Sequence, residues 1–155
     1  MTQHRPAPGR VAGVDYGTKR IGVAITDPAR TFASPLAQYN RGDKTQDARY
    51  FQRLAREENV ALFVVGLPIH LSGEESQKSH EARQFAAWLG ETTGKPVELF
   101  DERFTTAQAE EALLAGELTN KRRKARRDML AAQFLLAAYL EASRGRDVQA
   151  ESLED

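Results

Sequence analysis

Acidic side chains stand at three places where a predicted strand or helix begins or ends. These are Asp15 at the end of one strand, Asp101 and Glu102 after another, and Asp128 at the start of a strongly apolar helix. Strand ends and helix starts can meet at the rim of a sheet, so carboxylates there can converge without burying charge in its middle. Carboxylates that lie close together repel one another unless a cation neutralises them. This pattern predicts a cation site at one edge of the fold.

The available ligand types decide which cation this would be. The chain has no cysteine and three scattered histidines, which excludes thiolate zinc sites and argues against a histidine-rich metal centre. Carboxylates without such partners favour hard divalent ions such as Mg²⁺ or Mn²⁺. Two such ions roughly 4 Å apart can activate a water molecule and stabilise the leaving oxygen of a phosphodiester. Hydrolysis of a nucleic-acid backbone is the chemistry that fits.

Each acid also has a simpler structural explanation. Asp15 can be a turn former, and Asp128 can be a helix N-cap. Either Asp101 or Glu102 can be a loop acid that pairs with Arg103. Asp128 supports the functional interpretation best, because an apolar helix offers solvent only at its end and a cationic run stands just before it.

That cationic run gives the chain a candidate surface for binding phosphates. Six of the seven residues from 121 to 127 are basic: Lys121, Arg122, Arg123, Lys124, Arg126 and Arg127. A cluster of this kind binds nucleic-acid backbone with little sequence preference, although alone it is equally typical of a solvated surface. Lys19, Arg20 and Arg103 lie beside the acids and are further candidates for phosphate contacts, with surface ion pairs or a solvated hairpin tip as the alternative.

Length and composition limit the class of protein. The 155 residues, 41% of them hydrophobic, suffice for one domain with a single core. Basic and acidic residues balance at 22 each, but four acids and no base fall in the last nine residues, so the remainder is positive. No apolar run approaches the roughly 18 residues of a membrane span, and the N-terminus lacks the apolar stretch of a signal peptide. We therefore expect a cytoplasmic protein without a membrane partner.

Hydrophobic patterning predicts the strands that carry these residues. Strand-like segments occur at 11–14, 21–25, 30–39, 61–65 and 97–100. The turn between the first two predicts a hairpin, and Pro35 makes the third an edge strand. The fourth is continuously apolar, which is typical of a central strand covered on both faces.

Helices are predicted between and after the later strands. Helical periodicity or capping residues indicate helices over 48–58, 82–89, about 105–114 and 128–142. The last is apolar except for Gln133 over most of its length, which predicts that it packs between layers. The order predicts an α/β fold with a mixed sheet flanked by helices. We expect a flexible tail at 1–9, one domain over 10–143 and an acidic tail at 144–155.

Four sequence blocks resemble a known family. They are DYGTKRIGVA at 15–24, VGLP at 65–68, DERFTT at 101–106 and DMLAA at 128–132. In this order, over residues 11–141, they are similar to the YqgF-type family. Its members are described as Holliday-junction resolvases with a ribonuclease H-like fold, linked in bacteria to 5′ maturation of 16S ribosomal RNA. The loop after Pro68 departs from the family pattern, which puts its contacts with substrate in question.

The resemblance implies a five-stranded sheet in the order 3-2-1-4-5 and a carboxylate triad. The triad maps onto Asp15, Glu102 and Asp128 as catalytic residues and as ligands of Mg²⁺ or Mn²⁺. In this mapping Asp15 bridges two ions, Glu102 holds one and Asp128 holds the other. The implied function is a metal-dependent endonuclease that hydrolyses structured nucleic acid, in 5′ maturation of pre-16S rRNA.

Other functions fit parts of the sequence. A Holliday-junction resolvase acting on branched DNA would use the same triad, whereas a non-catalytic RNA-binding module would need only the basic run. The turn at Asp15 also resembles the phosphate loop of actin-like and sugar-kinase ATPases, but those enzymes need two lobes and this chain has room for one. The sequence leaves RNA or DNA as the substrate open, and we expect a monomer or a weak homodimer.

Overall fold

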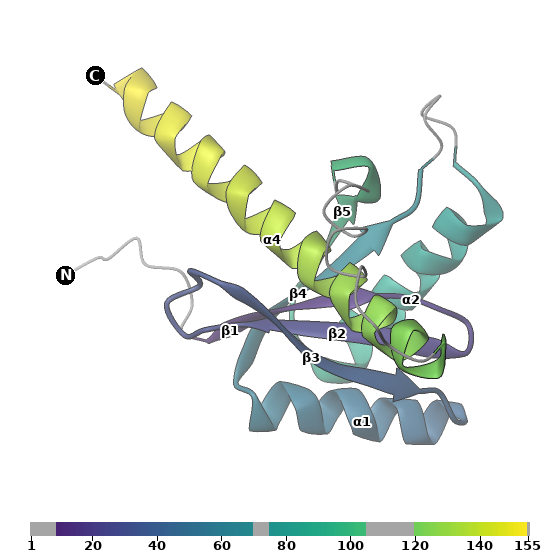
Figure 1. The fold of residues 1–155 in the computed structure, drawn as a ribbon. Helices are drawn as coiled ribbons and strands as arrows, with labels where there is room; N and C mark the ends of the chain where they lie inside the picture. The colour runs from purple at the N-terminus through teal and green to yellow at the C-terminus, as the bar shows by residue number, and fades with distance from the viewer. Residues whose placement is uncertain (1–8, 70–74, 105–119, 155) are drawn as a thin grey trace.

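A single five-stranded sheet with the strand order β3-β2-β1-β4-β5 organises the chain (Figure 1). The computed structural model describes residues 9–69, 75–104 and 120–154, and the side chains of these residues except 104, 120–126 and 146–154. The strands are β1 (Arg10–Asp15), β2 (Arg20–Thr26), β3 (Ala33–Asn40), β4 (Val60–Leu67) and β5 (Val97–Asp101). The helices are α1 (Lys44–Glu57), α2 (Gln77–Thr93), α4 (Asn120–Glu154) and the short 3-10 helix η1 (Glu102–Phe104). The predicted mixed sheet and its strand order are confirmed.

Strand directions bring the ends of three strands to one edge of the sheet. β1 and β2 form the predicted antiparallel hairpin, and β3 completes the meander as an edge strand. Pro35 lies on β3, where an edge strand tolerates the missing amide hydrogen. β4 runs parallel to β1, and β5 runs parallel to β4. Because parallel strands end on the same side, the carboxyl ends of β1, β4 and β5 share one edge, where α/β proteins usually bind ligands.

Helices α1 and α2 cover one face of the sheet. Phe63 and Val65 of β4 pack there against Phe51 of α1 and Phe85 of α2. The rings of Phe51 and Phe85 meet edge to face with centroids 5.7 Å apart, a favourable arrangement for aromatic pairs. Trp88 packs against the same cluster. These aromatic residues belong to the core, as their helical and strand spacing predicts.

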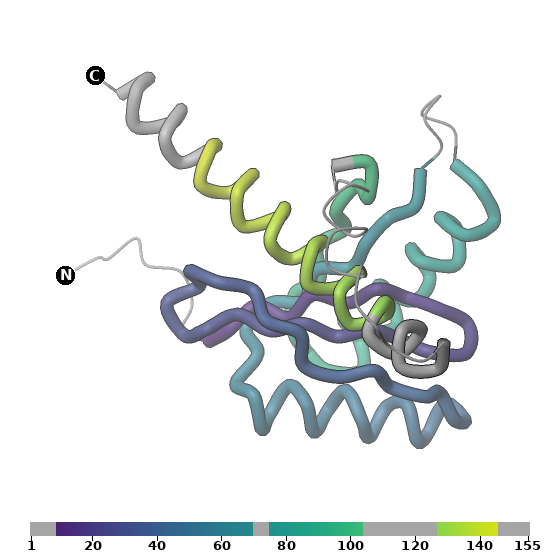
Figure 2. Tube along the Cα trace, viewed as in Figure 1, coloured from purple at the N-terminus to yellow at the C-terminus, as the bar shows by residue number. Residues whose placement is uncertain are grey.

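Helix α4 covers the opposite face and crosses β1, β2 and β3, as the chain trace in Figure 2 shows. Its buried Ala132 and Leu136 pack against Val11, Ala24 and Val64. Val64 therefore faces α4 while its neighbour on β4 faces the other core, so this strand is covered on both sides as predicted. The sequence analysis predicted that this helix packs between two layers. In the described part of the chain, the sheet is one of these layers.

The helices extend beyond their apolar centres. α1 and α2 begin at capping boxes formed by Asp43 and Ser76, ahead of their periodic residues. The prediction of a last helix confined to 128–142 and followed by a loose acidic tail is wrong, because α4 begins at Asn120 and ends at Glu154. The basic run is rich in good helix formers and the last segment contains no proline, so helix propensity carries the helix past its apolar part.

Three sequence predictions fall outside the part of the chain that the structure describes. They are the helix expected at 105–114, the tail before Gly9 and most of the loop after Pro68. Within the described residues, every helix is too short or too polar to cross a membrane.

Candidate active site

Asp15 ends β1 on the face of the sheet that α4 covers. Side chains alternate along a strand, and Val14 points into the core under α1 and α2, so Asp15 points to the opposite face. Its partner across the hairpin is Gly22. On the other side, Val14 pairs with Val65, which brings Gly66 beside the acid. Asp15 therefore stands between two residues that have no side chain.

Gly66 leaves the space that Glu102 occupies. A Cβ atom at this glycine would lie 2.6 Å from Glu102 Oε1 and 3.3 Å from Glu102 Cδ, closer than packed side chains tolerate. The Glu102 carboxylate thus lies over β4, next to the strand that carries Asp15. Both acids line one cavity of about 400 Å³ at the ends of β1 and β4. The structure brings these two predicted site residues together.

Helix α2 contributes two charged residues to the same cavity. Lys78 and Glu81 line it, together with Thr18 from the turn after β1. The sequence analysis did not single out Lys78 or Glu81, because charged residues on an amphipathic helix resemble a solvated face. Their spacing of three residues shows only that they share a side of the helix. The packing of α2 beside the sheet edge is what brings them to the acids.

Asp128 lies close to this site through its backbone, but its carboxylate is directed elsewhere. A Cβ atom at Gly22 would collide with the backbone carbonyl of Asp128, so α4 rests directly on β2, the strand paired with β1, at this residue. The Asp128 carboxylate does not line the cavity. Instead its Oδ2 accepts hydrogen bonds from Arg20 Nε at 3.0 Å and Gln38 Nε2 at 2.7 Å.

Two of the three predicted metal ligands therefore share a cavity, and the third lies beside it in another hydrogen-bonding arrangement. Among the residues that the structure describes, no three acidic or histidine side chains are close enough to hold a metal ion together. The donors at the cavity are carboxylate oxygens, with no sulfur and no imidazole. Oxygen donors of this kind fit Mg²⁺ or Mn²⁺, which keep several water ligands when the protein supplies few.

The predicted phosphate-binding cations divide into paired and exposed ones. Arg20 forms an ion pair with Asp128, and Arg103 forms one with Asp101 through Nη2 and Oδ2 at 2.6 Å. Hydrogen bonds from Arg103 hold the pKa of Asp101 below its usual value. Asp101 thus pairs with the exposed arginine, whereas Glu102 lines the cavity, so Glu102 stays the predicted metal ligand.

The remaining cations are Lys19 and the basic run before Asp128. Lys19 is exposed at the hairpin turn. The run forms the first turns of α4, and within it the side chain of Arg127 is described and is exposed. The side chains of Lys121, Arg122, Arg123, Lys124 and Arg126 lie outside the described part, so their contact with nucleic acid stays a prediction.

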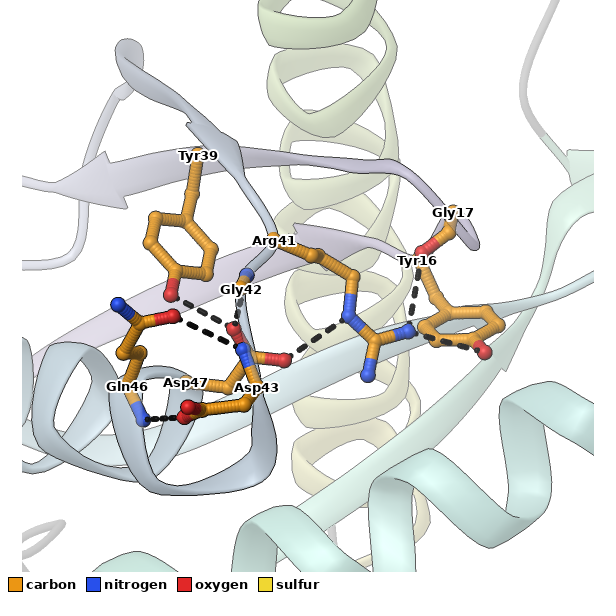
Figure 3. A network of polar contacts seen from close by, with 8 residues as sticks. All are labelled: Tyr16, Gly17, Tyr39, Arg41, Gly42, Asp43, Gln46 and Asp47. Carbon is orange, nitrogen blue, oxygen red and sulfur yellow. Dashed lines mark hydrogen bonds and ion pairs between the residues drawn. The ribbon is translucent and has the colours of Figure 1, made fainter.

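A buried polar network holds the turn that follows Asp15 (Figure 3). Asp47 of α1 is buried, and its carboxylate accepts hydrogen bonds from Arg41 Nε at 3.1 Å and from the Tyr39 hydroxyl at 2.6 Å. Arg41 reaches from there to the turn, where Nη1 donates to the Tyr16 hydroxyl at 3.3 Å and to the Gly17 carbonyl at 3.4 Å. Tyr16 and Gly17 line the cavity, so this network positions one of its walls.

Electrostatics keep this network charged near neutral pH. Burial would raise the pKa of Asp47, but hydrogen bonds from Tyr39, the Gly42 amide and Arg41 outweigh it and hold the pKa below its usual value. Burial and the bond to Asp47 raise the pKa of Tyr39 to about 12. Near neutral pH Asp47 is therefore an anion that anchors Arg41. The sequence analysis missed both residues, because an isolated acid in a helix gives no signal of a distant arginine partner.

Solved structures of similar architecture include two Holliday-junction proteins. A Thermus thermophilus RuvC bound to a Holliday junction substrate is similar with a TM-score of 0.56, at 17% identity over 87% of this chain and 96% of that one. The Holliday junction resolvase of fowlpox virus is similar with a TM-score of 0.51, at 16% identity over 86% of this chain and 99% of that one. At these identities the likeness concerns the fold, and it confirms the predicted ribonuclease H-like architecture.

Sequence relatives are much closer. A protein of Rhodopirellula baltica that is named as a pre-16S rRNA nuclease is 54% identical over 97% of this chain and 87% of its own length. A protein of the same name from Koribacter versatilis is 39% identical over 86% of this chain and 87% of its own. The model of the RuvX family, described as Holliday junction resolvase, matches residues 9–142, which include all four sequence blocks and both cavity acids. The chain belongs to the RuvX family.

Proposed function

We propose that the protein is a divalent-metal-dependent endonuclease that hydrolyses phosphodiester bonds in structured nucleic acid during 5′ maturation of pre-16S rRNA in the cytoplasm. The observation that carries this proposal is the shared cavity of Asp15 and Glu102 at the edge of the sheet. Membership of the RuvX family and the relatives named as pre-16S rRNA nucleases support it.

Asp15 and Glu102 would hold Mg²⁺ or Mn²⁺, because their oxygens share the cavity and the adjacent glycines leave room there. Such an ion supplies Lewis-acid activation of water and neutralises charge on the leaving oxygen. Lys78 lines the same cavity and would contact a non-bridging phosphate oxygen of the bound strand. These roles place the scissile phosphate between the end of β1 and the start of α2.

Asp128 would complete the triad when its carboxylate turns toward Asp15. It would then lose its hydrogen bonds from Arg20 and Gln38. A phosphate that binds Arg20 competes for the same guanidinium and so favours that change. Lys19, Arg103, Arg127 and the other basic residues of 121–127 would hold the backbone on either side.

The test is a cleavage assay on a 5′-extended pre-16S rRNA fragment, with Mg²⁺ or Mn²⁺ and with EDTA as the metal-free control. Asp15→Asn and Glu102→Gln should each lower the rate at least about a hundredfold, because each removes a charged ligand. Asp101→Asn is the matched control, since this neighbouring acid pairs with Arg103 instead of lining the cavity. Circular dichroism should show that all three variants fold.

Two results would count against the proposal. An equal loss in Asp101→Asn and Glu102→Gln would show that the assignment of the carboxylates is wrong. If the purified protein binds the RNA but does not cleave it with any divalent ion, it is an RNA-binding module of the same fold.

A second candidate function is resolution of Holliday junctions in branched DNA. The description of the RuvX family favours it. A four-way DNA junction tested beside the RNA fragment distinguishes the two substrates. A resolvase cuts two strands symmetrically and commonly acts as a dimer. We propose a monomer or weak homodimer, which sedimentation with and without the junction can measure.

A further inference from the structure

A second hollow lies at the same end of the sheet, between the end of β3 and helix α1. Its volume is about 480 Å³. We call it the arginine hollow, and its side chains include Tyr39, Asn40, Arg41, Arg49, Tyr50 and Arg53. Nothing in the proposed chemistry at Asp15 and Glu102 uses this hollow.

The arginine hollow has an excess of positive charge. Arg49 and Arg53 are exposed and lie one turn apart on α1. Neither forms an ion pair or a hydrogen bond with another residue in the described part of the chain. Asp47 on the same helix does not neutralise them, because its buried carboxylate already binds Arg41 and Tyr39. Two unpaired guanidinium groups that border one hollow are suited to an anionic ligand.

The wall of the hollow is rigid. Tyr39 and Tyr50 stack with ring centroids 3.9 Å apart and an angle of 14° between the rings. Tyr39 is further fixed by its hydrogen bond to Asp47, and Tyr50 also packs edge to face on Phe51 of the core. A wall that is ordered before a ligand binds lowers the entropy lost on binding.

Arg41 connects the arginine hollow to the active-site cavity. Its side chain borders the hollow, and its Nη1 contacts Tyr16 and Gly17, which line the cavity of Asp15. Its guanidinium also lies over the Tyr16 ring, 5.4 Å from the centroid. A nucleic-acid strand that leaves the cavity on this side therefore meets Arg41 first and then the exposed arginines of α1.

We propose that the arginine hollow binds the phosphate backbone of the substrate nucleic acid, outside the segment that is cut. This inference rests on the proposed function, since it assigns the hollow to the substrate of the neighbouring cavity. Arg49 and Arg53 would each contact a phosphate. The hollow would add affinity without reading sequence, because its contacts are to the backbone.

The test measures binding of a fluorescent hairpin RNA with a single-stranded 5′ extension, in EDTA so that no cleavage occurs. Replacing Arg49 and Arg53 together by Ala should weaken binding roughly tenfold to thirtyfold at 150 mM salt. The slope of log affinity against log salt should fall by about 1.4 to 1.8, the value for two lost phosphate contacts. Replacing both by Lys should retain most of the salt dependence, since the charges remain.

The matched control is Arg56→Ala combined with Lys95→Ala. It also removes two positive charges, but from exposed positions near the opposite end of the sheet, where β4 and β5 begin. This control should keep the affinity and salt slope of the wild-type protein. Equal affinity and slope in the Arg49/Arg53 variant and this control would overturn the proposal. Because binding is measured without metal, a failure of Asp15→Asn to abolish cleavage would refute the proposed function and leave this result unaffected.

Discussion

Replacing Gly66 by Ala should displace the Glu102 carboxylate without lowering the stability of the fold. The new Cβ atom would lie 2.6 Å from Glu102 Oε1 and 3.1 Å from Cγ. Normal van der Waals contact needs about 3.4 Å or more, so the carboxylate oxygen must move by roughly 0.8 Å. The obstacle is the end of a flexible side chain, which can move without any shift of the backbone.

The two consequences have opposite signs. A displacement close to 1 Å at a catalytic group costs on the order of a hundredfold in rate, so cleavage by Gly66→Ala should fall by about that factor. Stability should stay the same or rise by up to about 1 kcal/mol, because Gly in a strand is entropically unfavourable and Gly66 does not adopt a positive φ. A variant that is as stable as the wild type and nearly inactive is therefore expected.

The assay combines single-turnover cleavage of the 5′-extended RNA at saturating Mn²⁺ with urea unfolding. Gly90→Ala is the control, because a Cβ atom there would lie 3.5 Å from Val97 Cγ2 and 3.6 Å from the Lys95 carbonyl, in ordinary contact. It should cleave at the wild-type rate. Cleavage by Gly66→Ala at the wild-type rate would refute the argument that the placement of Glu102 over this glycine matters for catalysis.

The buried network around Asp47 gives two further predictions. Asp47→Ala should lose about 3 kcal/mol of unfolding free energy in urea, because Arg41 keeps its charge and loses its partner; an unchanged midpoint would contradict this. The lowered pKa of Asp47 stabilises the fold above its ordinary pKa near 3.8, and this contribution disappears as the pH falls through the lower folded-state pKa. Tyr39, with its pKa raised to about 12, stabilises the fold below pH 10, and this contribution disappears between pH 10 and 12. Tyr39→Phe should therefore show a smaller loss of stability than the wild type over that alkaline range, and an equal loss would contradict the assignment.

Local patterns were enough to predict most of the secondary structure. The apolar run that became β4, the turn after Asp15 and Pro35 on the edge strand each follow from side-chain periodicity or backbone restriction within a few residues. The ends of the helices were harder to predict, because caps and propensity carry a helix beyond its apolar residues. α4 is the main example, since its basic and acidic ends contribute nothing to periodicity.

Part of the candidate site was also predictable. Asp15 and Glu102 follow strands whose carboxyl ends share an edge, so their meeting follows from topology. The choice of Glu102 over Asp101 came from the family resemblance, because the sequence pattern does not show which of two adjacent acids directs its side chain toward the site. Lys78 and Glu81 could not be found, because their role depends on where α2 packs.

The amino-acid sequence by itself thus determined which segments are strands, their order along the chain and the family, because these depend on short-range periodicity and on motifs read in order. The contacts among distant side chains came from packing alone. Two examples are the ion pair of Arg20 with Asp128 and the contacts of Arg41 with Asp47 and Gly17. These contacts depend on interatomic distances and side-chain rotamers, which no pattern along the sequence encodes. The same reason applies to the wall of the arginine hollow, which forms because Tyr39 of β3 stacks on Tyr50 of α1.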